Sequence, residues 1–532
     1  VLLPKVPSPP GTNPGARAVY YWPMQQSARM MWYHDHAIGL TRLNAYAGIV
    51  SAVLLRDPYE AALVQSSGLP AYIEDGGLEL PIVVQDKVFV GSDGGAADGW
   101  NGIPGVPSDP GSLWYAHVYD TARYGKLGPQ PLGPPPPISC VPEFFGDTML
   151  ANGTVYPDAS VEPRRYRLRI LNACNARFLN LQMYVDDGSP AAITLNGKGN
   201  PLNVGALNPA APNPQGKPTS SFLVLGTEGG FLPRPAYVAS AVPFNGTPAG
   251  GSLLLAPAER ADVLFDFSLY AGKNIVLYTD CPAPFPMGDP LNDFFPGLAN
   301  KNPVNAATAA TPASGPNTRI IMRFAVKPVA TVPVDPPLSL TRASDLTAGN
   351  EPLLAVPGAM ALPPSVQNTR VLTLNEGFDG HGRLIQFLGT NVPDAMGAYG
   401  RDYEDPETET PKLGDTEVWQ IVNPTADTHP IHFHLVNVQI ISRQAFTRFG
   451  GNPGVANLGG APVPPAPFER GWKETVRMNP GEVTTVAMKF QLPAGLPYRV
   501  QDSPRTGGKE YVWHCHILEH EEHDMMRPLI VT

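Results

Sequence analysis

Short apolar segments, separated by clusters of glycine, proline and polar residues, recur along most of the chain. Residues 165–172 (RYRLRILN), 261–267 (ADVLFDF) and 274–279 (NIVLYT) are clear examples. Segments of this length, bounded by turn-forming residues, are typical of β-strands, whose side chains point alternately to opposite faces. Apolar residues at helical spacing are scarce. The pattern therefore predicts an all-β protein.

Breaks in the pattern divide the chain into three predicted domains, at residues 1–60, 75–326 and 327–532. In the first, residues 28–36 and 45–56 are interpreted as two strands. Two strands bury too little apolar surface to form a stable core. The first domain is therefore predicted to be incomplete, whereas repeated short strands predict a β-sandwich for each of the other two.

Segments rich in proline, glycine and small polar residues predict loops and linkers. The chain has 63 prolines and 53 glycines among its 532 residues, a high share that lies between regular strand-like segments. We therefore expect long ordered loops rather than a disordered chain. The predicted loops and linkers are residues 1–19, 57–80, 188–220, 283–318 and 445–468.

The densest group of metal-binding side chains lies near the end of the chain, in the segment YVWHCHILEHEEHDMM. On a strand, Cys515 points to one face while His514 and His516 point to the other. One strand can therefore serve two metal sites. With His520 and Met525, the cysteine supplies most of a blue-copper centre, which takes two histidines, a thiolate and a weak axial methionine. The adjacent Met526 is the alternative to Met525. The segment HILEHEE predicts a short helix with both of its histidines on one face.

Two further histidine clusters supply imidazoles. In HPIHFH, the proline after His429 is predicted to interrupt the strand ladder and let His429 turn towards the cysteine. His432 and His434 then share a strand face, and WYHDH places His34 and His36 at the same spacing. Eight of the eleven histidines are candidate ligands within these three clusters, a density that predicts bound copper.

These motifs resemble those of the multicopper oxidases. HCHILEHEEHDMM, WYHDHAIGLTRLNAYAG, LAPAERADVLFDF and GDTEVWQIVNPTADTHPIHFH are similar to segments of the branch that contains spore-coat laccase, phenoxazinone synthase and bilirubin oxidase. The resemblance implies tandem cupredoxin-like Greek-key β-barrels. It also implies a laccase-like reaction, in which one-electron oxidation of phenols or aminophenols is coupled to four-electron reduction of dioxygen to water.

The resemblance further implies a role for each candidate residue. Glu521 is the expected proton-relaying carboxylate, and a solvated helix acid beside its glutamate neighbours is the alternative reading. The expected copper ligands are His429, Cys515, His520 and axial Met525 for type 1 copper, His432 for type 2 copper, and His34, His36, His434, His514 and His516 for the type 3 pair.

One implied motif is missing from this sequence. Multicopper oxidases hold their trinuclear cluster with eight imidazoles, and this chain offers six. We expect an N-terminal companion polypeptide to donate the other His-x-His motif and to cover residues 1–56, where apolar residues around Met31 and Ile49 would otherwise be exposed. The alternatives are a truncated oxidase, or a non-catalytic blue-copper protein with an electron-transfer or coat role and an incomplete trinuclear site.

The reducing substrate is encoded less clearly. Bilirubin oxidases often carry tryptophan two residues before the blue-copper histidine, and Asp427 stands there in this chain. The 13 methionines are scattered, whereas copper-oxidising relatives usually have methionine-rich segments. A small phenolic or aminophenolic reductant is therefore the leading prediction.

The net charge and the cysteine content limit the possible partners and the cellular compartment of the protein. A formal net charge of −10 argues against nucleic acid, which requires basic patches, and no apolar run reaches the roughly 18 residues of a membrane-spanning helix. Of the four cysteines, Cys515 is assigned to copper, which leaves three. A disulfide is predicted between Cys140 and Cys174, with Cys174–Cys281 as the alternative. Together with two Asn-Gly-Thr triplets, this predicts an extracellular, cell-surface or periplasmic protein.

Overall fold

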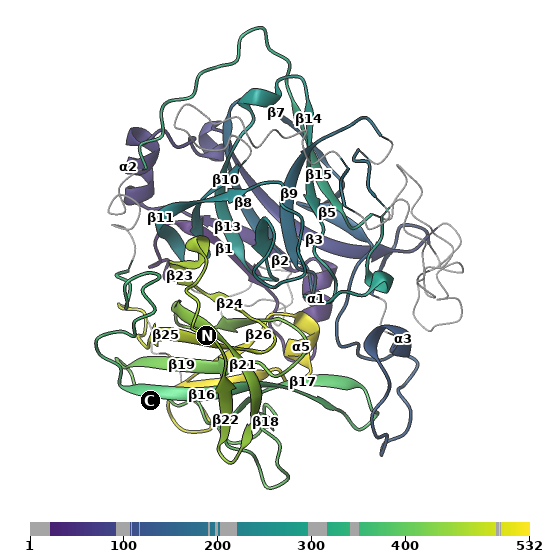
Figure 1. Ribbon diagram of the computed structural model, residues 1–532, viewed down its shortest axis with the longest axis vertical. Coiled ribbons are helices and arrows are strands. Elements are labelled where there is room, and N and C mark those ends of the chain that lie inside the picture. Colours follow the sequence, from purple (N-terminus) through teal and green to yellow (C-terminus); the bar gives the residue numbers. More distant parts are fainter. Residues whose placement is uncertain are drawn as a thin grey trace, which may run out of the picture.

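The computed structural model describes residues 22–91, 107, 109–115, 118–189, 192–196, 200–202, 221–295, 317–340, 351–495, 500 and 502–532. Almost all of its regular structure is strand, so the all-β prediction is confirmed (Figure 1). The strands form one hairpin sheet and two β-sandwiches. The predicted loop at residues 1–19 lies outside the described residues. The domain boundaries at residues 60, 75 and 326 stay a prediction.

The N-terminal hairpin sheet consists of β1 (Arg29–His34) and β2 (Val50–Leu55), joined through α1 (Thr41–Ala47). The apolar residues of one face, among them Met30, pack against Leu171 of the middle sandwich. The prediction of a strand from residue 45 was wrong. Residues 41–47 form a helix, which ends at Gly48 in a left-handed conformation (φ 119°) that glycine adopts without strain.

The middle sandwich packs an eight-stranded sheet against a five-stranded one. Its core contains fully buried side chains from both sheets, such as Phe222 and Val263 against Leu181 and Val276. Each such side chain contributes about 1.5–3 kcal/mol when it leaves water. The first sheet, in spatial order, is β11 (Gly230–Ala239), β10 (Ser221–Thr227), β13 (Arg260–Asp266), β8 (Arg165–Asn172), β3 (Glu79–Phe89), β5 (Thr148–Ala151) and β6 (Thr154–Val155), with β4 (Leu113–Trp114) beside β3. The second is β12 (Leu253–Leu255), β9 (Leu179–Val185), β14 (Asn274–Thr279), β15 (Ile320–Val326) and β7 (Asp158–Val161).

The C-terminal sandwich is built in the same way and holds most of the candidate ligands. Trp419 and Trp513, whose ring centroids lie 5.3 Å apart, fill the space between its sheets. The larger sheet is β18 (Gly400–Arg401), β17 (Leu384–Thr390), β16 (Asn368–Phe378), β19 (Thr416–Val422), β25 (Glu482–Lys489), β21 (Val438–Gly451) and β22 (Gly454–Leu458), with β23 (Trp472–Lys473) beside β21. The smaller is β24 (Thr475–Met478), β20 (His429–Phe433), β26 (Lys509–Cys515) and β27 (Met526–Val531).

Short helices occupy several connections. Two of the predicted loops and linkers proved structured: residues 57–80 contain a helix whose N-cap, Asp57, accepts a hydrogen bond from the Glu60 N–H, and residues 445–468 contain the end of β21 and all of β22. In Figure 1, α1 lies beside the C-terminal helix where the two sandwiches meet. The remaining helices are α2 (Pro58–Ser66), η1 (Ile73–Asp75), α3 (Thr121–Tyr124), η2 (Ser268–Tyr270), η3 (Pro290–Asn292), η4 (Pro467–Glu469) and α5 (Leu518–Glu522).

The predicted disulfides were wrong, because all four cysteines are free. Cys174 is buried in the core of the middle sandwich, whereas Cys281 is buried in the cluster that also contains Cys515. Burial raises the pKa of both thiols well above the ordinary value, so they behave as small apolar side chains. The prediction of an oxidising compartment loses its main support.

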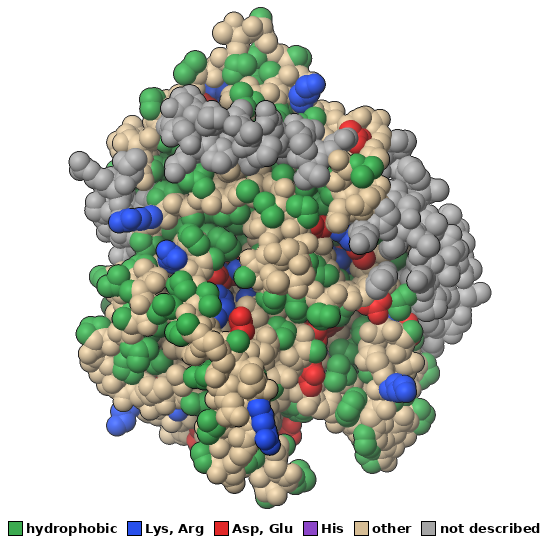
Figure 2. All heavy atoms as spheres, viewed as in Figure 1, with side chains coloured by type: hydrophobic (Ala, Val, Ile, Leu, Met, Phe, Trp, Pro, Cys, Tyr) green, Lys and Arg blue, Asp and Glu red, His purple; other side chains and the backbone are tan. Residues whose placement is uncertain are grey.

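The face of the molecule shown in Figure 2 carries few charged side chains. On the face in Figure 2, Lys and Arg side chains are scattered and do not gather into a basic patch. Among the described residues, no helix has the length and apolar character needed to cross a membrane.

Candidate metal centres

Strand alternation in β20 and β26 separates the candidate ligands into two groups. Ile431 of β20 pairs with Cys515 of β26, and His432 pairs with His514. His429 lies inside the ladder, opposite Met478 of β24, so the predicted interruption at the following proline was wrong. The His516 N–H instead donates to the carbonyl of that proline at 2.7 Å. Alternation along β20, rather than a break, turns His429 towards Cys515 and His432 to the opposite face.

The first group is His429, Cys515 and His520, all fully buried. The Nδ1 atoms of His429 and His520 each lie 3.7 Å from Cys515 Sγ. The Thr425 hydroxyl donates to Asn423 Oδ1 (2.7 Å) and is left to accept from His429 Nε2 (2.8 Å). The unprotonated Nδ1 of His429 therefore faces the thiol. Burial lowers the pKa of His429 to about 3, which keeps it in the neutral form that binds metals.

Met525 fits this first group better than Met526 does. The Met525 side chain is fully buried in the apolar cluster that contains Cys515, and its carbonyl accepts the Cys515 N–H at 2.9 Å. Met526 begins β27 and lines a cavity of about 540 Å³ together with His36 and His434. The two methionines therefore face different groups of ligands.

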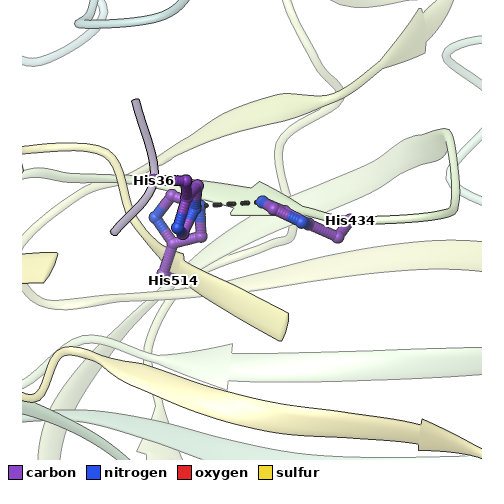
Figure 3. A group of neighbouring side chains, drawn as sticks. All are labelled: His36, His434 and His514. Carbon is purple, nitrogen blue, oxygen red and sulfur yellow. Dashed lines mark hydrogen bonds between the residues drawn. The ribbon is translucent and has the colours of Figure 1, made fainter. Parts of the chain in front are cut away.

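The second group gathers six histidines where the hairpin sheet meets the C-terminal sandwich. The Nε2 atom of His514 lies 3.3 Å from Nε2 of His36 and 3.2 Å from Nε2 of His434, so three rings converge on one point (Figure 3). The other three rings lie beside these, with centroids 5.1 Å apart for His34 and His516 and 5.6 Å apart for His432 and His516. Desolvation is the largest influence on the pKa of every member, and the net pKa is lowered for all except His514.

Glu521 places a buried carboxylate against this second group. Its Oε2 lies 3.0 Å from His514 Nδ1 and its Oε1 lies 3.6 Å from His36 Nδ1. Burial alone would raise the pKa of Glu521, but the adjacent His514 and His36 bring it down to about 2. In the same way, burial opposes protonation of His514 while the Glu521 carboxylate raises its pKa. Glu521 therefore faces the histidines rather than solvent.

Helix α5 contributes His520 to the first group and directs Glu521 at the second, and its other glutamates point elsewhere. Glu519 accepts hydrogen bonds from the Tyr115 hydroxyl (2.7 Å) and Asn175 Nδ2 (2.8 Å), and Glu522 pairs with Arg42 of α1. The prediction that the histidines of HILEHEE share one helix face was wrong. The first of them precedes the helix and lies in the six-histidine group, whereas the second lies beside Cys515.

Sequence analysis did not identify a functional role for three carboxylates, those of Glu143, Asp427 and Glu376. The Nε2 atom of His520 has no hydrogen-bond partner among the described residues and lies 3.9 Å from Glu143 Oε1. Desolvation, and then the charge of Asp427, raises the pKa of Glu143 well above its usual range. Desolvation also raises the pKa of Asp427 to about 6, and desolvation with the neighbouring Asp427 raises that of Glu376 to about 7. Only Asp427 stands near a ligand in the sequence.

The donor sets suit copper. A cysteine sulfur with two neutral imidazoles and a nearby thioether is the ligand type of a blue-copper centre, and clustered imidazoles also bind copper. The thiol of Cys515 has a raised pKa because it is buried, so binding of a metal there requires release of its proton. Two β-sandwiches with these sites joined through one strand define a cupredoxin-like copper protein.

Comparison with known proteins identifies the family. The multicopper oxidase family model matches residues 383–532. A laccase of Bacillus subtilis is 34% identical over 519 residues, which are 97% of this chain and 73% of the laccase. Multicopper oxidase LPR1 of Arabidopsis thaliana is 27% identical over 531 residues, which are 97% of this chain and 69% of LPR1. The solved structure of an Aquifex aeolicus McoA multicopper oxidase variant has a TM-score of 0.54 and 21% identity, and the match covers 95% of this chain and 77% of that one.

The chain belongs to the multicopper oxidase family, copper-dependent oxidoreductases that use dioxygen as electron acceptor. The predicted family and the cupredoxin-like fold are thereby confirmed.

Proposed function

We propose that this chain is the larger part of a laccase-like oxidase that passes electrons from a small aromatic reductant to dioxygen, forming water. The buried group around Cys515 takes the electron from the reductant, and the six-histidine group belongs to the site of oxygen reduction. The proposed ligands are His429, Cys515, His520 and Met525 for type 1 copper, His432 for type 2 copper, and His34, His36, His434, His514 and His516 for the type 3 pair.

The observation that carries this proposal is the connection between the two groups. Cys515 lies in the first group, while the residues on either side of it, His514 and His516, lie in the second. The His514 Nδ1 atom also lies 2.9 Å from the Cys515 carbonyl oxygen. Copper bound at both groups would supply one-electron chemistry. The chain itself supplies a short covalent path, a water-excluding core around the thiolate, and a carboxylate beside the histidines that can hold a proton.

Two imidazoles remain to be supplied to complete the inferred trinuclear cluster. The cavity lined by His36 and His434 opens next to apolar side chains with large exposed fractions, including Ile38 (72%) and Trp22 (56%). We propose that a segment outside this sequence covers these residues and donates a His-x-His pair. An N-terminal companion polypeptide is one source, and another part of the same polypeptide is the other.

An anaerobic reductive titration tests the proposed reaction. The copper-loaded native protein should accept four electrons, bleach, and regain its colour with one dioxygen per four electrons and no release of hydrogen peroxide. Uptake of a single electron, with no dioxygen consumed, would instead support the electron-transfer or coat role. Release of peroxide would contradict four-electron reduction.

A cationic reductant is a second candidate, favoured by a group of three carboxylates, one of which lies 3.9 Å from His520 Nε2. These groups, Glu143, Glu376 and Asp427, pair with no lysine or arginine side chain among the described residues, and Glu143 faces only the neutral His520 ring. The pKa values of about 6 for Asp427 and about 7 for Glu376 mean that negative charge builds up at the site as the pH rises through 6–7. A divalent metal ion, or an aromatic reductant that carries an alkylammonium group, would stabilise that charge, whereas a neutral phenol would not.

Replacement of Asp427 distinguishes the two classes of reductant. For a cationic reductant, KM should fall between pH 5 and pH 8, and Asp427→Asn should raise KM about fivefold at pH 8, because a charge about 8 Å away contributes about 1 kcal/mol in an intermediate dielectric. At pH 5, where the carboxyl is mostly protonated, the variant should resemble wild type. The matched control is Asp158→Asn, which removes an exposed charge on the middle sandwich. An equal effect of Asp427→Asn on a neutral phenol would contradict the cationic candidate.

A further inference from the structure

The shorter of two contacts at Nδ1 of His432 is to a backbone carbonyl, and the other is to the Thr475 hydroxyl at 3.3 Å. The carbonyl oxygen of Glu474 accepts hydrogen bonds from the Phe433 N–H (3.1 Å) and from Nδ1 of His432 (2.8 Å). Because a carbonyl can only accept, Nδ1 of His432 carries the proton and Nε2 keeps its lone pair for a metal. Any shift of Glu474 would therefore disturb both the angle of this ring and the choice of its free nitrogen.

The segment Trp472–Thr475 is held against the turn between β10 and β11 of the middle sandwich. The Thr227 hydroxyl donates to the Trp472 carbonyl at 3.0 Å. A Cβ at Gly229 would lie 2.0 Å from the same oxygen, so only glycine permits this close approach. The two sandwiches therefore meet here through backbone as well as side chains.

Glu228, in this turn, is the central group of the contact. Its fully buried carboxylate binds Lys473 Nζ at 2.7 Å, and the same oxygen lies 3.4 Å and 3.5 Å from the backbone nitrogens of Glu474 and Thr475. Its other oxygen accepts the Arg260 N–H at 3.2 Å. One carboxylate thus fixes both the side chain before Glu474 and the peptide groups on either side of it.

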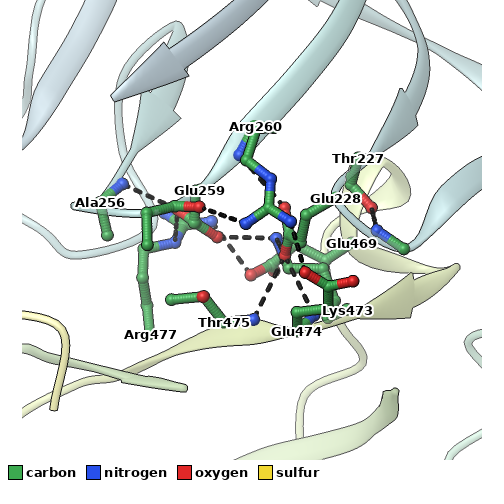
Figure 4. A network of polar contacts seen from close by, with 12 residues as sticks. Thr227, Glu228, Ala256, Glu259, Arg260, Glu469, Lys473, Glu474, Thr475 and Arg477 are labelled. Atoms are coloured by element: carbon green, nitrogen blue, oxygen red, sulfur yellow. Dashed lines mark hydrogen bonds and ion pairs between the residues drawn. The ribbon is translucent and has the colours of Figure 1, made fainter. Parts of the chain in front are cut away.

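The side chain of Glu474 is held as well. It pairs with Arg260 of β13, and its Oε1 lies 3.5 Å from Arg29 Nη1 of β1, the strand that ends at His34. Lys473 also binds Glu259 at 2.8 Å (Figure 4). The β1 strand, the middle sandwich and the C-terminal sandwich therefore converge on the residue whose carbonyl orients His432.

We propose that Glu228 is a positioning residue for the metal bound by His432: it fixes the Glu474 carbonyl, which holds the His432 ring with Nε2 free. The inference rests on the proposed role of His432 as a copper ligand. Removal of a group that orients a ligand typically lowers metal affinity about 10–100-fold. The charge of Glu228 matters most, because it is buried against the Lys473 ammonium group.

Glu228→Gln keeps the shape of the side chain and removes its charge. We expect the copper affinity of the non-blue site at His432 to fall about 10–100-fold, seen as loss of the type 2 signal in electron paramagnetic resonance at limiting copper. The blue absorption should stay at wild-type intensity. In the copper-free protein, nitrogen-15 spectra of the His432 ring should show one protonated Nδ1 in wild type and a mixture of ring forms in the variant.

Three further variants make the result decisive. Glu60→Gln is the matched control, because Glu60 is equally buried and paired with arginines in the same sandwich but does not contact the Trp472–Thr475 segment. Should Glu228→Gln fail to fold, Glu474→Gln loosens the same carbonyl from a less buried position. His432→Ala tests the ligand assignment itself. A wild-type signal in His432→Ala would overturn that assignment and the inference with it. If the type 2 signal is lost in His432→Ala but kept in Glu228→Gln, only the role of Glu228 is overturned. An equal loss of that signal in Glu228→Gln and Glu60→Gln would have the same consequence.

Discussion

Cys515→Ser is expected to abolish the intense blue absorption of the copper-loaded protein and to reduce oxidation of an aromatic reductant to background. The cysteine sulfur is 3.7 Å from both Nδ1 atoms of its group, and Cys515 is the one cysteine in a candidate metal-binding group of the described residues. A serine hydroxyl is a poor ligand for copper and gives no thiolate-to-copper absorption. Visible absorption and oxygen consumption, measured on the same preparation, check both parts.

Cys281→Ser is the control for this substitution. Cys281 is also buried, and it belongs to the same apolar cluster, so its replacement tests the cost of placing a hydroxyl in this core. The Cys281→Ser protein should keep its blue band even if it unfolds at a lower temperature. A blue band that survives Cys515→Ser would contradict the ligand assignment.

The features that could be predicted from sequence are those set by local periodicity. Alternation along one strand was enough to place Cys515 on one side and His514 and His516 on the other, as the structure does. The strand pattern also predicted the fold class, because short apolar segments between turns leave few other solutions. Apolar periodicity says little about short helices, so α1 was missed; it packs against α5, which is distant in the sequence.

The features that could not be predicted depend on contacts between distant segments. Glu143 and Asp427 are separated by most of the chain, and only the fold brings their charges close to His520. The predicted Cys174–Cys281 alternative for the disulfide was wrong for the same reason, because the two cysteines are buried in different apolar clusters. The strand at His429 shows a second limit of prediction from sequence. A proline is expected to break a strand, yet Pro430 remains in the ladder because its carbonyl still accepts a hydrogen bond.

Glu521→Gln is expected to slow reoxidation of the reduced protein by dioxygen about 10²–10⁴-fold, the usual contribution of a positioned proton-transfer group. The amide keeps the size of the side chain but cannot relay a proton at 3.0 Å from His514 Nδ1. The blue band and its anaerobic bleaching by reductant should not change, because the Glu521 carboxylate lies against His514 and His36 of the second group. Stopped-flow mixing of the reduced protein with dioxygen separates the two half-reactions, and Glu522→Gln, which alters a glutamate paired with Arg42, is the control.

The copper-free protein offers an independent test through pH. The folded-state pKa of Glu521 is lowered to about 2, below the ordinary value of about 4.3, so its ionised form stabilises the fold above that ordinary value. This contribution, on the order of 3 kcal/mol, should be lost as the pH falls towards 2. The difference in unfolding free energy between wild type and Glu521→Gln should therefore be largest near neutral pH and shrink below pH 4. A difference that does not depend on pH would show that Glu521 acts only through packing, and the proton-relay role would then lose its electrostatic basis.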